Sequence, residues 1–80
     1  MNWNEYIVSD ENILLGKPII KGTRISVELI LELLAEGWNE HKLLESYPNL
    51  TREALQAVFS FTKECMQNEM YFQFAEKAVS

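Results

Sequence analysis

Short apolar runs alternate with polar turns through the first third of the chain. The runs are Tyr6-Ile7-Val8, Ile13-Leu14-Leu15, Pro18-Ile19-Ile20 and, after a further turn, Arg24-Ile25. Runs of this length are typical of short strands, and Pro18 suits a strand start or a sheet edge because it cannot donate to the ladder. Such strands are unstable alone, so we expect residues 6–26 to be covered by helices or by a second copy.

From residue 27 onward the apolar spacing changes to that of an amphipathic helix. The positions that recur at i, i+3, i+4 and i+7 are Val27, Ile30, Leu31 and Leu34. This spacing predicts a helix over about residues 27–36. Ser26 is a good N-cap, and Gly37 suits the position after the helix because glycine adopts positive φ without strain.

Two further helices are predicted downstream. Asn39 caps a short helix over about residues 40–46, in which Leu43 and Leu44 face inward. A break at Tyr47-Pro48-Asn49-Leu50 follows, and Thr51 then caps a third helix. The last two helices are therefore expected to form a loose helix-turn-helix arrangement.

The third helix is predicted to be long, because neither Gly nor Pro occurs from Arg52 to the end of the chain. Its apolar stripe consists of Ala54, Val58, Phe61, Cys65, Phe72, Ala75 and Val79. We expect this stripe to form one buried seam with Cys65 as a small core residue. Residues 66–80 extend past the helical core 27–65, and their methionines and aromatic residues predict contact with a second chain.

The predicted fold is therefore mainly α with a small N-terminal β element, in one domain spanning residues 1–80. Hydrophobic residues make up 48% of the chain, which is more than one small core can hide, so we expect a homodimer or a docking surface for another protein. No apolar run approaches the roughly 18 residues of a membrane span. The N-terminus lacks a signal-peptide pattern, and with the single Cys65 this predicts a cytoplasmic protein.

The charge is distributed unevenly along the chain. The net charge is −5, and residues 25–80 carry all of the deficit because the acidic and basic residues of 1–24 balance. Nucleic-acid binding depends on phosphate neutralisation, so an acidic helical body argues against strong intrinsic DNA binding. A local basic patch or a basic protein partner fits the charge distribution better.

No combination of residues predicts catalysis, a metal site, a cofactor or a small-molecule substrate. His41 is the only histidine, and with Cys65 it supplies at most two of the three or four ligands that zinc requires. We expect His41 to be a solvated helix-surface residue. The acidic residues spaced four apart are Glu28, Glu32, Glu36 and Glu40. Their spacing is typical of a solvated helix face, or of a docking surface for a basic protein.

The stretch Gly16–Val27 holds three of the seven basic residues and no acidic one. Gly16 and Gly22 are interpreted as backbone devices for turns. The sequence around Gly22 and Thr23 lies close to a helix start but lacks the fuller Walker or dinucleotide pattern, which disfavours nucleotide binding. Arg24 has two interpretations: it contacts phosphate or a partner carboxylate, or its guanidinium bonds main-chain carbonyls and clamps the turn.

Two motifs together resemble the signature of the DUF433 proteins. The first is Gly16-x-Pro18-x-Ile20-x-Gly22-Thr23-Arg24-Ile25-x-Val27, and the second is Tyr47-Pro48-x-Leu50-Thr51. The resemblance covers about residues 6–65. The sequence departs from the family at Ser26, where proline is frequent, and this should be harmless because serine caps helices well.

The resemblance implies a homeodomain-like helical domain that forms dimers. It also implies a non-enzymatic role like that of the antitoxin of a bacterial toxin–antitoxin pair, with a PIN-like ribonuclease as the partner. The alternative is a helix-turn-helix DNA-binding regulator, for which the basic residues of one side would be Lys17, Lys21, Arg24, Arg52 and Lys63. The third helix is not basic, which is a departure from a DNA-reading homeodomain-like protein.

Overall fold

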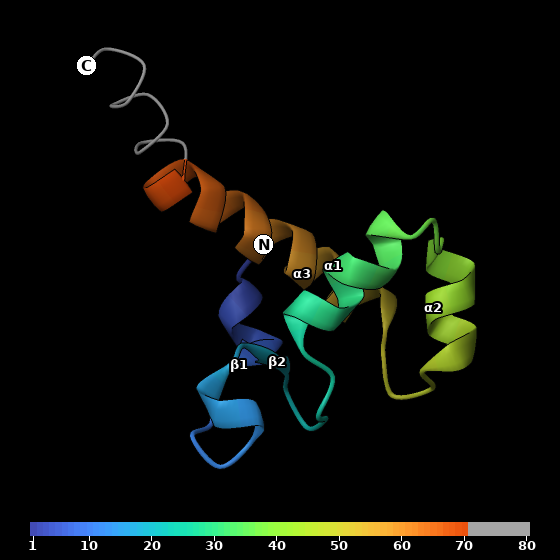
Figure 1. Ribbon diagram of the computed structural model, residues 1–80, viewed down its shortest axis with the longest axis horizontal. Helices are drawn as coiled ribbons and strands as arrows, with labels where there is room; N and C mark the ends of the chain where they lie inside the picture. The colour runs from blue at the N-terminus through green and yellow to red at the C-terminus, as the bar shows by residue number, and fades with distance from the viewer. Residues whose placement is uncertain (71–80) are drawn as a thin grey trace.

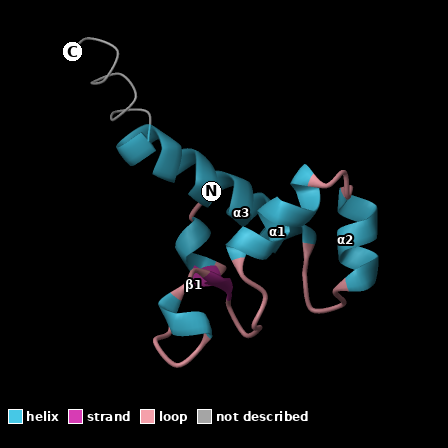
Figure 2. Cartoon of the chain, in the orientation of Figure 1, coloured by secondary structure: helices cyan, strands magenta, loops and turns pink. Residues whose placement is uncertain are grey.

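Three α-helices build most of the fold in the computed structural model, which describes residues 1–70. They are α1 (Val27–Ala35), α2 (Glu40–Ser46) and α3 (Arg52–Cys65). A two-stranded sheet of β1 (Ile7–Val8) and β2 (Ile19–Ile20) lies on the N-terminal side, as Figures 1 and 2 show. The prediction of a mainly helical domain with a small N-terminal β element is confirmed.

The two strands pair antiparallel, with Ile7 opposite Ile20 and Val8 opposite Ile19. The second edge of β2 is also occupied, because Ile19 forms a bridge with Ser26. Two further bonds close this edge: the Ile20 N–H donates to the Ile25 carbonyl at 2.8 Å, and the Val27 N–H donates to the Pro18 carbonyl at 3.0 Å. The Arg24-Ile25 run therefore contributes bridge contacts to β2 instead of a strand of its own.

Both ends of α1 are closed as predicted. The Ser26 hydroxyl accepts a hydrogen bond from the Leu29 N–H at 2.9 Å. Gly37 has φ +101°, and the N–H groups of Gly37 and Trp38 donate to the carbonyls of Leu34 and Leu33. This pair of bonds is the Schellman motif, which satisfies carbonyls that a helix end otherwise leaves unpaired.

The starts of α2 and α3 are also capped as predicted. The Asn39 side chain accepts a hydrogen bond from the Lys42 N–H at 2.9 Å, and the Thr51 hydroxyl accepts one from the Ala54 N–H at 3.0 Å. With 7 residues, α2 is too short to be stable alone, so packing must hold it. Leu43 supplies that packing, since its side chain is completely buried in the core.

The hydrophobic core lies where α3 packs against β1 and the other helices. Its buried members are Ile7, Ile20, Val27, Ile30, Leu43, Leu50, Ala54, Leu55, Ala57 and Val58. α3 contacts both β1 and the N-terminal turn Trp3–Glu5. Trp3 extends this contact by packing edge-on against Phe61, with ring centroids 4.8 Å apart. No helix in the described range 1–70 is long and apolar enough to cross a membrane.

The expectation that residues 13–15 form an extended run is wrong. Leu14 and Leu15 have φ of +49° and +58°, and Gly16 follows with φ +82°. Together they form one left-handed turn, closed by bonds from the Gly16 and Lys17 N–H groups to the carbonyls of Ile13 and Leu14. Apolar composition favoured a strand, but β1 and the Ile25–Ser26 segment already occupy both edges of β2.

The predicted long C-terminal helix is confirmed, whereas the predicted burial of Cys65 is wrong. α3 ends at Cys65, and Met66–Met70 form a π-helical turn. Cys65 is exposed because α3 extends beyond Phe61, which is the last α3 residue packed against the core. Phe72, Ala75 and Val79 of the predicted stripe, and most of the 66–80 extension, lie outside the described residues.

Replacing Leu43 with alanine tests how α2 is held. Leu43→Ala is expected to lower the free energy of unfolding by about 3 kcal/mol, because it removes buried methyl groups and leaves a cavity. Leu15→Ala is the matched control, since Leu15 is 95% exposed and its truncation should change stability by less than about 0.5 kcal/mol. Urea unfolding followed by circular dichroism measures both, and equal midpoints would contradict the assigned core.

The left-handed turn predicts opposite effects at two neighbouring residues. Leu15→Gly is expected to raise the free energy of unfolding by about 0.5–1 kcal/mol, because glycine adopts positive φ without the penalty that leucine carries. Gly16→Ala is expected to lower it by about 1 kcal/mol through backbone strain alone, since a Cβ at Gly16 meets no atom within 4 Å.

Thermal unfolding of these two variants and the wild type measures the difference. A loss of stability in Leu15→Gly would show that residues 14–16 are not left-handed.

Candidate functional site

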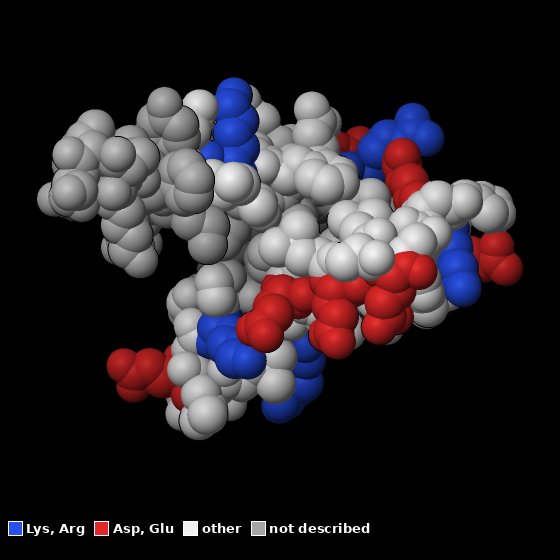
Figure 3. Space-filling model, turned by 45° about the horizontal axis from the view of Figure 1, so that its top comes forward, with Lys and Arg blue, Asp and Glu red and all other residues white. Residues whose placement is uncertain are grey.

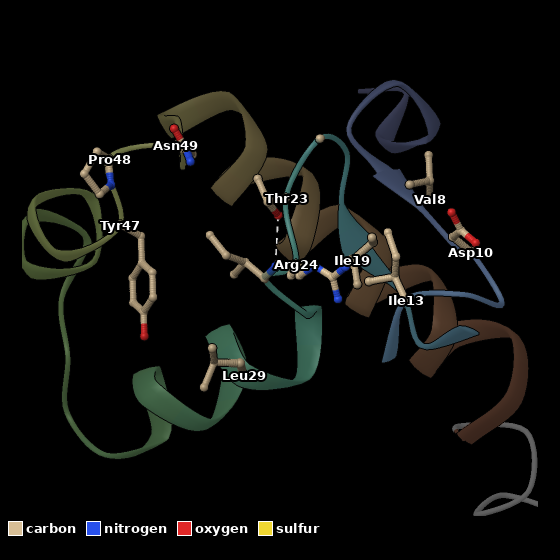
Figure 4. A pocket seen from close by; sticks show the side chains of 12 residues that line it. Val8, Asp10, Ile13, Ile19, Thr23, Arg24, Leu29, Tyr47, Pro48 and Asn49 are labelled. Atoms are coloured by element: carbon tan, nitrogen blue, oxygen red, sulfur yellow. Dashed lines mark hydrogen bonds between the residues drawn. The ribbon is translucent and has the colours of Figure 1, made fainter. Parts of the chain in front are cut away.

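The two sequence motifs, distant in the chain, line one open groove. The groove has a volume of about 750 Å³, and we call it the motif groove. One wall comes from Gly22-Thr23-Arg24-Ile25 and the other from Tyr47-Pro48-Asn49. Figure 4 shows these side chains on two sides of the opening, with Val8, Asp10 and Ile13 beyond Arg24 and Leu29 of α1 below.

A glycine turn and one hydroxyl fix the first wall. Gly22 has φ +80°, and the Thr23 N–H donates to the Ile20 carbonyl at 3.0 Å, which closes a turn that requires positive φ at its third residue. The Thr23 hydroxyl donates to the same carbonyl at 2.8 Å and accepts the Ile25 N–H at 3.0 Å. The interpretation of Gly16 and Gly22 as turn devices is confirmed, and Thr23 braces the turn that positions Arg24.

The second wall is the connection between α2 and α3. The Tyr47 N–H donates to the Leu43 carbonyl at 2.9 Å, and the Leu50 N–H donates to the Tyr47 carbonyl at 2.9 Å, so the connection is a compact turn. The Tyr47 ring lies against Trp38, with centroids 6.5 Å apart. Because Leu43 and Leu50 are buried in the core, this wall is anchored on both sides of Tyr47.

Arg24 does not act as the clamp that was one of its two interpretations. Its side chain is exposed and makes no hydrogen bond or ion pair with any of residues 1–70. Asp10, the acidic residue in the same groove, already accepts the N–H of Asn12 at 2.9 Å. The guanidinium is therefore a positive charge in a mainly apolar groove, with its donors available to a partner.

Two of the five basic residues of the DNA-binding alternative are ion-paired within the described structure. Lys17 pairs with Glu28 at 3.1 Å, and Arg52 pairs with Glu40 at 2.7 Å. Lys63 lies beside the N-terminal turn, roughly 16 Å along α3 from Arg52 at the helical rise per residue. Lys21 and Arg24 lie on either side of Gly22, and neither forms an ion pair with any of residues 1–70.

The glutamates of α1 form an acidic row on the described surface. Glu28, Glu32 and Glu36 are all exposed and lie four residues apart, and Figure 3 shows acidic side chains in a band across one face. Glu40 does not continue the row on the same helix, because Gly37 ends α1 and Glu40 begins α2, where it pairs with Arg52. The predicted acidic face therefore contains Glu28, Glu32 and Glu36 but not Glu40.

The chemistry-bearing residues considered for catalysis or metal binding lie apart. His41 is exposed on α2, as expected of a solvated surface histidine, and its Nε2 lies 3.1 Å from Glu45 Oε2. Cys65 is exposed at the end of α3. Within residues 1–70, no three His, Cys, Asp or Glu side chains are grouped closely enough to hold a metal ion.

Two features of this site were not predicted. One is the contribution of Tyr47-Pro48-Asn49 to the groove, although the joint occurrence of the two motifs was a signal that they meet in space. The other is Leu29, which lies outside the apolar stripe of its helix and received no predicted role. In the structure Leu29 lines both the motif groove and a second hollow beside the left-handed turn.

The chain is similar to proteins whose activity is not known. It is 33% identical over 52 residues to the "Uncharacterized protein y4eO" of Sinorhizobium fredii (strain NBRC 101917 / NGR234), which covers 65% of this chain and 24% of that protein. The chain thus spans about a quarter of this relative's length. The crystal structure of a DUF433 member protein from Anabaena variabilis ATCC 29413 matches with a TM-score of 0.69 and 27% identity, covering 92% of this chain and 68% of that one.

Residues 7–62 match the family described as "Protein of unknown function (DUF433)", and this range contains both motifs and both walls of the motif groove. A match over this share of the chain, together with the shared fold, identifies the family. The chain belongs to the DUF433 family.

Proposed function

We propose that this protein is a non-enzymatic interaction protein that binds a partner protein, like the antitoxin of a bacterial toxin–antitoxin pair. The observation that carries the proposal is the motif groove, because both family motifs converge on it. The expected partner is a PIN-like ribonuclease, and the expected assembly is a homodimer bound to it. The ribonuclease is carried over from the family resemblance, and the groove supports the binding role.

The character of the groove fits a protein segment. Its volume of about 750 Å³ lies within the range of small-molecule sites. Such sites enclose their ligand and converge several polar groups on it, whereas this groove is open and mainly apolar. Arginine and aromatic side chains that line one apolar surface are typical of the residues that dominate protein–protein binding energy. Arg24 and Tyr47 provide this combination.

The homodimer is supported by exposed apolar side chains away from the groove. Phe59 in the C-terminal half of α3 and Met66 in the π-helical turn that follows it are 51% and 52% exposed. Large apolar side chains on one helix are a common homodimer surface. Light scattering of the purified protein should give twice the mass of one chain, and a monomer mass at micromolar concentration would contradict the dimer.

Co-expression with the adjacent open reading frame tests the partner. The neighbouring gene product should co-purify with this protein, and its toxicity to the host cell should be relieved. The absence of a stable complex together with unrelieved toxicity would overturn the antitoxin-like role. A neighbouring gene that encodes a DNA-modifying or metabolic protein would overturn the ribonuclease as the partner.

Arg24→Ala tests whether the motif groove holds the partner. We expect affinity for the partner to fall at least roughly tenfold, because truncation of an arginine anchor commonly costs more than 1 kcal/mol of binding free energy. Stability should be unchanged, since the guanidinium bonds none of residues 1–70. Lys42→Ala is the matched control, because Lys42 lies over the Trp38 ring, 4.2 Å from its centroid, and does not line the groove. Equal affinities of wild type and Arg24→Ala by calorimetry would place the partner elsewhere.

A further inference from the structure

The left-handed turn exposes a leucine that does not pack against the core. Leu15 is 95% exposed, and its neighbour Leu14 is 44% exposed. Both residues have positive φ, a conformation that costs an ordinary residue roughly 1–2 kcal/mol. Glycine would make the same turn without this penalty and without exposing an apolar side chain. Core packing therefore does not explain the leucine at position 15.

Leu15 lies at the rim of a hollow between the turn and α1. The hollow has a volume of about 390 Å³. Its apolar lining comes from Leu14, Leu15 and Leu29, and its charged lining comes from Lys17, Glu28 and Glu32. An exposed apolar residue beside an open hollow is the arrangement of a binding surface for another chain.

The charge beside the hollow indicates the kind of partner. The exposed row Glu28, Glu32 and Glu36 runs along α1 from the hollow, and Lys17 offsets only one of these carboxylates by pairing with Glu28. A second copy of this chain would bring the same carboxylates to the surface, and like charges across an interface repel. A segment with basic residues complements the row instead.

The four-residue spacing of the glutamates matches the spacing of side chains on one face of an α-helix. We propose that Leu15 and the hollow beside it bind a basic amphipathic helix of a partner protein. The apolar face of that helix covers Leu15 and Leu29, and its lysine or arginine residues, spaced about four apart, pair with Glu32 and Glu36. This deepens the proposed function and rests on it, because it names a face through which the partner is held.

Two synthetic peptides probe this surface without the natural partner. Both are amphipathic helices of about 15–20 residues, long enough to form a helix, with leucines at i, i+3, i+4 and i+7. One carries lysines four residues apart along its flank, and the other carries glutamates at the same positions. We expect fluorescence anisotropy to show the lysine peptide binding at least roughly tenfold more tightly than the glutamate peptide, with an affinity that falls as salt is added.

Two substitutions locate the binding on the proposed face. Leu15→Ala removes the exposed side chain and keeps the backbone, and it should weaken the lysine peptide at least roughly tenfold. Glu32→Lys should weaken the lysine peptide and strengthen the glutamate peptide. Glu53→Lys is the matched control for Glu32→Lys, because it reverses the charge of an exposed acidic residue outside the hollow. It should bind both peptides as the wild type does.

Several results would overturn the proposal. These are failure of the wild type to bind the lysine peptide, equal binding of both peptides, and unchanged binding by Leu15→Ala. Conversion of a dimer to a monomer by Leu15→Ala in light scattering would show that a second copy covers this face. The test is separate from that of the proposed function. If the protein prefers the lysine peptide as expected but the neighbouring gene product does not co-purify, the proposed binding face is supported and the ribonuclease partner is wrong.

Discussion

The strand Ile19–Ile20, hydrogen-bonded on both edges, is the constraint on which the rest of the structure depends. One edge pairs with β1, and the other holds the segment that leads into α1 through the Ile20–Ile25 and Val27–Pro18 bonds. Both isoleucines are buried, at 2% and 4% exposure. Ile20 belongs to the core that α3 covers, while Ile19 contributes to the motif groove. A strand of two residues thus joins the core to the candidate site.

The same constraint explains the turns on either side of the strand. The chain must reverse between Ile20 and Ile25 within four residues, which requires the positive φ of Gly22 and the two bonds of the Thr23 hydroxyl. These bonds place Arg24 at the groove. On the other side, residues 13–15 find no free edge of β2 to pair with, so their backbone bonds are satisfied locally in a left-handed turn. Leu15 is exposed as a consequence.

Local signals predicted most of the helical framework. Ser26, Asn39 and Thr51 each cap the helix that their position indicated, because N-caps depend on only three or four neighbouring residues. Contacts between distant segments were less accessible to pattern analysis. The apolar character of Cys65 could not show that α3 extends past its last packing partner. Nor could local sequence show that Lys17 and Arg52 are paired with glutamates 11 and 12 residues away.

The motif groove and the Leu15 hollow are neighbouring parts of one surface, because Leu29 of α1 lines both. Leu29 lies outside the apolar stripe of α1 that the core buries, so its side chain is available to line both the groove and the hollow. Their polar groups differ in sign: the groove offers the guanidinium of Arg24, and the hollow is bordered by Glu32. A partner that covers both must present a carboxylate to one and basic side chains to the other. This requirement specifies orientation as well as identity, since a segment bound in the reverse direction would oppose like charges at both ends.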